Sequence, residues 1–137
     1  MPPITRGFIK ASLLYLVLAM GLAVFQALQP LLGLSISGLS PVYFHLFLVG
    51  WVTQMIMGVG LWFFPKYSQA RPRGSQTAAW ASFWLLNLGL LLRAVAEPAA
   101  SAQPAAIWLW ALVLSAVAQW LAALLFVLNV WPRIKER

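Results

Sequence analysis

The side chains best suited to chemistry lie on one apolar stretch, which carries the only histidine of the chain. His45 is followed by Gly50, Gln54 and Gly58, and the last three are spaced four apart, so they share one face of a helix. Glycines on such a face let another backbone or a flat cofactor approach closely. Neutral imidazole is a ligand of haem iron, so this pattern predicts haem ligation by His45. The alternative is a histidine hydrogen-bonded to a neighbouring helix or to interfacial water.

A second polar pair, Arg93 and Glu97, is spaced four apart and can form an ion pair on one helix face. We expect Arg93 at the same depth as His45, where it would face a haem propionate. The alternative is an interfacial ion pair without a ligand. Asn87 is expected to hydrogen-bond between helices. A stripe of small residues predicts helix packing and consists of Ala111, Ser115, Ala118 and Ala122.

Missing residue types exclude several kinds of site. The chain has no cysteine, so disulfides, thiolate metal sites and iron-sulfur clusters are excluded. One histidine excludes a multi-histidine copper or zinc centre built by one copy alone. The apolar stretches also lack a nucleophile, an acid-base pair and a metal cluster, so we expect no catalysis by the chain alone.

The elements that carry these residues are membrane helices. Of the 137 residues, 63% are hydrophobic and 8% are charged, whereas a soluble domain carries about a quarter charged residues. Crossing the hydrocarbon takes about 20 mostly apolar residues. The sequence therefore predicts an all-α integral membrane four-helix bundle, one domain over residues 1–137. Its helices are expected at residues 11–28, 43–64, 78–96 and 105–130, and Pro98 is expected to close the third.

The net charge of +7 indicates topology, because the basic residues lie between the apolar runs. A cytoplasmic N-terminus places eight of the nine on the inner side and only Arg93 outside. Those eight are Arg6, Lys10, Lys66, Arg71, Arg73, Arg133, Lys135 and Arg137. This predicts both termini inside, with residues 29–41 and 97–104 outside, in a bacterial-type inner (cytoplasmic) membrane. The expected partner is the lipid bilayer and not nucleic acid, because these loops lack interleaved aromatic residues.

Residues 45–66 resemble the second transmembrane helix of subunit I of the haem-copper oxidases, the cytochrome c oxidase and nitric oxide reductase group. That helix carries a histidine, a glycine five residues later, an aromatic residue, a Met/Ile-Gly segment and a terminal proline. The matching residues here are His45, Gly50, Trp51, Met57-Gly58 and Pro65. Residues 87–93 similarly resemble the next helix of short relatives. The resemblance implies a haem b near the outer surface, with His45 as an axial ligand.

The chain also departs from that family. The oxygen-reducing site and the second axial haem ligand of the family need histidines on later helices, and none follows His45. The resemblance therefore extends only to His45 as a haem ligand. It implies a small membrane subunit that binds haem b in electron transfer or in a respiratory-type assembly. The alternative is a haem-free structural or assembly subunit.

The sequence also bears on transport and on association with other chains. A small multidrug exporter is disfavoured because such exporters use a glutamate in the first helix, and this chain has no acid in its first two spans. Glycine and alanine stripes on more than one helix exceed what one small bundle buries. We therefore expect a homo-oligomer or a subunit of a larger membrane complex.

Overall fold

The fold is entirely helical over the residues that the computed structural model describes, 1–69 and 74–134. In chain order the helices are α1 (Pro3–Leu28), α2 (Leu39–Phe44), the π-helix η1 (His45–Thr53), α3 (Gln54–Phe63), α4 (Gln76–Ala102), α5 (Ala106–Val130) and the 3-10 turn η2 (Trp131–Arg133). The elements α2, η1 and α3 continue one another, and we call them together the α2–α3 rod (Leu39–Phe63). With this rod, the described residues form four helices that are long and apolar enough to cross a membrane, as predicted.

Two predicted helix boundaries are wrong. The first helix begins at Pro3 and not near residue 11, because charges such as Arg6 and Lys10 limit the part inside lipid but not the helix itself. The third continues through Pro98 to Ala102, so Glu97 lies in the helix. A proline removes only one backbone donor and can be tolerated in membrane helices. The other helices agree with prediction within a few residues.

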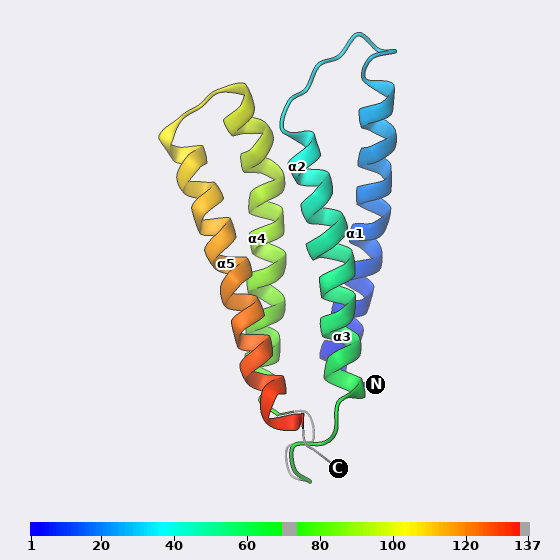
Figure 1. Cartoon of the computed structure of the whole chain (residues 1–137), viewed down its shortest axis with the longest axis vertical. Helices are drawn as coiled ribbons and strands as arrows, with labels where there is room; N and C mark the ends of the chain where they lie inside the picture. Colours follow the sequence, from blue (N-terminus) through cyan, green and yellow to red (C-terminus); the bar gives the residue numbers. More distant parts are fainter. Residues whose placement is uncertain (70–73, 135–137) are drawn as a thin grey trace.

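The helices form two neighbouring pairs, one made of α4 and α5 and the other of α1 and the α2–α3 rod (Figure 1). The first residues of α1 and the last of η2 lie at one end of the bundle, which we call the terminal end (Figure 1). The connections 29–38 and 103–105 lie at the other, which we call the loop end. Of the bases used to predict topology, Arg71, Arg73, Lys135 and Arg137 lie outside the described residues.

Small residues bring α4 and α5 together. The hydroxyl of Ser115 donates to the carbonyl oxygen of Gly89 at 2.7 Å, and that of Ser82 donates to the carbonyl of Ala122 at 2.7 Å. Each bond joins one helix of the pair to the other, so the backbones approach closely. The predicted small-residue stripe of the last helix is therefore confirmed as a packing surface.

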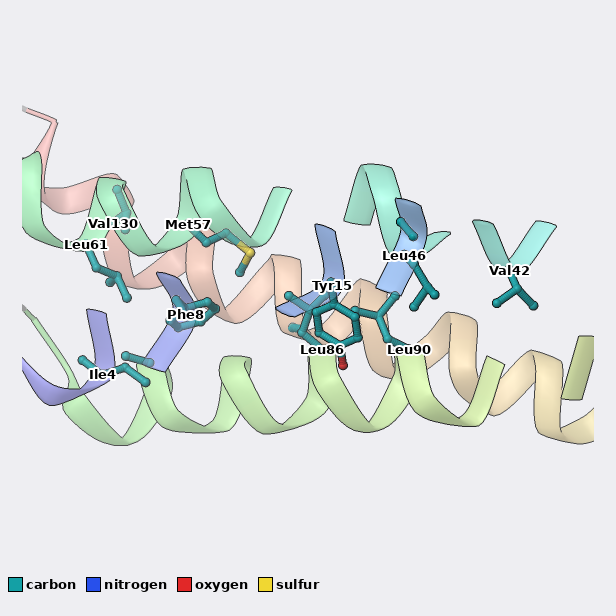
Figure 2. Packing of buried hydrophobic residues seen from close by; sticks show 13 residues of the cluster. Ile4, Phe8, Tyr15, Val42, Leu46, Met57, Leu61, Leu86, Leu90 and Val130 are labelled. Atoms are coloured by element: carbon teal, nitrogen blue, oxygen red, sulfur yellow. The ribbon is translucent and has the colours of Figure 1, made fainter. Parts of the chain in front are cut away.

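The apolar core lies where α1, the α2–α3 rod and α4 meet. Phe8 and Tyr15 of α1 point into it, and Leu86 and Leu90 of α4 close it from the other side (Figure 2). Most large apolar residues of α5 are exposed in the isolated chain, as expected for a helix that faces lipid.

Candidate functional site

His45 is the first residue of η1 and is half-buried. Its Nδ1 atom lies 2.9 Å from the carbonyl oxygen of Pro41, one turn earlier in the rod. A carbonyl oxygen only accepts, so Nδ1–H is the donor. In the neutral ring this leaves the lone pair on Nε2, which is the arrangement found when a histidine binds a metal through Nε2. The hydrogen bond lies within the same helix and does not reach a neighbouring one.

Arg93 and Glu97 form the predicted ion pair on α4. Arg93 Nε lies 3.0 Å from Glu97 Oε1, and the two side chains are 19% and 15% exposed. Both charges are therefore held mostly within the protein near the loop end, where each offsets the desolvation of the other.

Two contacts align the α2–α3 rod with α4. Nearer the terminal end, Nε2 of Gln54 donates to Oδ1 of Asn87 at 3.4 Å. Near the loop end, a Cβ added to Gly38 would lie 2.7 Å from the backbone carbonyl oxygen of Glu97, the ion-pair partner of Arg93. Counted from the Gln54–Asn87 bond toward the loop end, His45 lies nine of the sixteen residues along the way to Gly38, and Arg93 lies six of the ten residues along the way to Glu97. The two residues are therefore at similar depths.

The predicted glycine groove is filled by α1. A Cβ added to Gly50 would lie 2.8 Å from Cγ of Tyr15, and one added to Gly58 would lie 2.8 Å from Cβ of Phe8. These glycines allow α1 to pack closely against the rod, and α1 occupies the space that a flat cofactor would need on this face. The nitrogen donor at His45 fits a haem ligand, whereas the glycine face has a packing role.

Gln54 is fully buried between the rod and α4. It joins Asn87, whose Nδ2 atom donates to the carbonyl oxygen of Phe83 at 2.7 Å. The predicted interhelical hydrogen bond of Asn87 is therefore present, and Gln54 is its partner. Among the described residues Oε1 of Gln54 has no hydrogen-bond partner. No cluster of three histidine, cysteine or acidic side chains suited to a metal occurs in residues 1–69 and 74–134.

Arg133 has a role that the sequence interpretation missed. Its guanidinium is fully buried and donates to the carbonyl oxygens of Leu61, Phe64 and Pro65 at 3.1, 2.8 and 2.9 Å. Pro65 has no N–H, so it cannot pair with the Leu61 carbonyl one turn earlier. Pro65 signals in the sequence that the helix stops there and that a carbonyl one turn earlier lacks its backbone donor. No local feature indicates that Arg133, 68 positions later, supplies the donor.

The sequence of the chain matches one family of known proteins. No curated protein and no solved structure matches the chain. The family model described as cytochrome c and quinol oxidase polypeptide I matches residues 3–137. The match covers all four apolar helices, so the chain belongs to the cytochrome c and quinol oxidase polypeptide I family.

Proposed function

We propose that this membrane protein binds haem b through Nε2 of His45 and serves in electron transfer within an oxidase-type assembly. The observation that carries the proposal is the hydrogen bond from Nδ1 to the carbonyl of Pro41 at 2.9 Å. It fixes the ring and its tautomer and leaves Nε2 as the ligating nitrogen. Family membership supports the same interpretation, because this oxidase family is related to haem-copper proteins.

Arg93 is the proposed partner of the haem propionates. Its depth matches that of His45, and a guanidinium forms charge-assisted hydrogen bonds with carboxylates. Glu97 orients the guanidinium through the 3.0 Å ion pair. When bound, haem b supplies one-electron transfer, while the residues of this chain hold and orient the group.

One histidine supplies one axial bond. A bis-histidine haem within one copy is therefore impossible, and the iron would either be five-coordinate or take its sixth ligand from another chain or a small molecule. A ligand from another chain requires a homo-oligomer or a larger complex, which we propose as the working form. We propose that the chain alone is not an enzyme.

The proposed orientation has both termini in the cytoplasm and the loop end outside, in a bacterial-type inner membrane. The support is the bias of basic residues. Arg6 and Lys10 lie in the first turns of α1 and Lys66 follows α3, all toward the terminal end, whereas Arg93 lies in the later part of α4, nearer the loop end. His45 is then in the outer half of the bilayer.

The alternative function is a haem-free structural or assembly subunit. The observation that favours it is the close packing of α1 against Gly50 and Gly58. Helix packing alone explains why glycine occupies these two positions. An absorption spectrum separates the two functions directly.

The test is the reduced-minus-oxidised visible spectrum of protein purified in mild detergent from haem-replete cells. We expect a Soret band in the parent, its loss in His45→Ala, and its retention in Gln119→Ala. Gln119 is a suitable control because it is also half-buried and makes one side-chain hydrogen bond, to Ser115 on its own helix. A parent without a Soret band, or an unchanged band in His45→Ala, would overturn haem binding in favour of the structural subunit.

A further inference from the structure

Up to the start of α3, the buried residues of the α2–α3 rod recur at a spacing of four. They are Val42, Leu46, Gly50 and Gln54, and α3 then buries Met57, Gly58 and Leu61 at ordinary helical spacing. In an α-helix, residues four apart are displaced by about 40° at each step, so such a series leaves one face within a few turns. A π-helix turns less per residue because its hydrogen bonds span five residues. The π-helix His45–Thr53 therefore keeps the series on one side of the rod.

The same winding sets the direction of His45, which lies nine residues before Gln54. Nine residues of α-helix make about two and a half turns, which would place His45 on the side opposite Gln54. Gln54 faces Asn87 of α4, so His45 would point away from α4. Nine residues of π-helix make only about two turns. The π-helix thus returns His45 toward the α4 side, where Arg93 lies at a similar depth.

Packing against α1 favours this winding. Gly50 lies in the middle of η1, and its missing side chain admits the buried Tyr15 ring. Gly58 admits Phe8 of the same helix α1. The contact at Gly50 lies within the π-helix and the contact at Gly58 lies beyond it, so the Tyr15 contact is the one that acts on the winding of η1.

We propose that Tyr15 and Gly50 are positioning residues for His45. Their contact holds η1 in its π winding and so keeps the imidazole on the α4 side, level with Arg93. The proposal rests on the proposed function only for the role of His45 as a haem ligand. Its geometry can be tested without haem.

The absence of native cysteine allows a direct test by cross-linking. Cysteines are placed by His45→Cys and Arg93→Cys, and a short bis-maleimide is added to the full chain in detergent. Intact mass spectrometry distinguishes one bridging reagent from two separate adducts. We expect bridging in this parent pair. Absence of bridging would overturn the proposed direction of His45.

Gly50→Ala is the critical variant, and Gly58→Ala is its matched control. Each added Cβ would lie 2.8 Å from a side-chain carbon of α1, but Gly58 lies beyond the π-helix. We expect Gly50→Ala to lower bridging by about threefold or more, because the overlap forces α1 and η1 to shift. Gly58→Ala should leave bridging unchanged. An equal fall in both variants, or no fall in Gly50→Ala, would overturn the proposal.

A second pair of variants keeps the test decisive if Gly50→Ala does not fold. Tyr15→Ala removes the ring and should lower bridging, whereas Tyr15→Phe keeps the ring and should not. Folding is checked with a separate pair, Ser12→Cys and Met55→Cys, because Oγ of Ser12 lies 3.7 Å from Sδ of Met55 just beyond η1. Unchanged bridging at positions 45 and 93 in Tyr15→Ala would contradict the positioning role. A missing Soret band would count against the proposed function but not against this geometry.

Discussion

The guanidinium of Arg133 donates a 2.8 Å hydrogen bond to the carbonyl oxygen of Phe64, the C-cap residue that directly follows α3. Two further bonds reach the carbonyls of Leu61 and Pro65. The last carbonyls of a helix lack intrahelical donors, and the negative end of the helix dipole favours a cation there. Arg133 therefore joins the chain after α5 to the end of α3 and ties the two helix pairs together at the terminal end.

Arg133→Ala is expected to lower the free energy of unfolding by about 2–3 kcal/mol, because it removes charge-assisted hydrogen bonds and leaves carbonyls unpaired. Arg133→Lys should recover only part of this loss, since an ammonium cannot reproduce the planar fork of donors. Unfolding in mixed detergent micelles measures both. Arg6→Ala is the control, because Arg6 is exposed and its loss should change little. Equal stability of the Arg133→Ala and Arg6→Ala variants would refute the capping role.

The α4–α5 contact at Gly89 gives a second prediction. A Cβ added to Gly89 would lie 2.9 Å from Cγ of Gln119 and 3.1 Å from the carbonyl oxygen of Ser115. Gly89→Ala is therefore expected to destabilise the protein by about 1–3 kcal/mol through overpacking. Gly21→Ala is the matched control, since nothing lies within 4 Å of its added Cβ. The same micelle unfolding assay applies, and a Gly89→Ala variant as stable as Gly21→Ala would show that the helices separate without cost.

Topology gives a third prediction, and the cysteine-free chain makes it simple to measure. Ser35→Cys, in the connection at the loop end, should react with a membrane-impermeant maleimide on intact cells. Lys66→Cys, which follows α3 at the terminal end, should react only after the cells are opened. The physical reason is the retention of basic residues on the cytoplasmic side. Labelling of Lys66→Cys from outside would reverse the proposed orientation.

The sequence was sufficient for the features that depend on local pattern. Apolar runs gave the four helices, the spacing of Arg93 and Glu97 gave their ion pair, and the small-residue stripe gave the α4–α5 contact. The spacing of Gly50 and Gly58 also indicated a close approach. It did not show whether a neighbouring helix or a flat cofactor packs there, because either one requires a helix face without side chains.

Other features depend on distant partners and could not be predicted. Arg133 lies 68 positions from Pro65, and its charge fitted equally well with a solvated loop. The π-helix is favoured by the seat of Tyr15 on Gly50, so it follows from tertiary packing and not from local propensity. Pro98 lies inside α4, which continues to Ala102, although prolines usually end helices. A proline removes only one backbone donor, and membrane helices tolerate that loss.

The charges near the proposed haem give a final prediction. Arg93→Gln removes a cation that disfavours the extra positive charge of ferric haem, so the haem midpoint potential should fall. Glu97→Gln removes the anion 3.0 Å from that cation, so the potential should rise. At the depth shared with His45, each change should amount to tens of millivolts, roughly what a unit charge about 10 Å away produces at an effective dielectric constant near 20. Spectroscopic redox titration of the purified variants measures both shifts. Shifts of the same sign would indicate general loosening of the fold, and potentials equal to that of the parent would place Arg93 away from the haem.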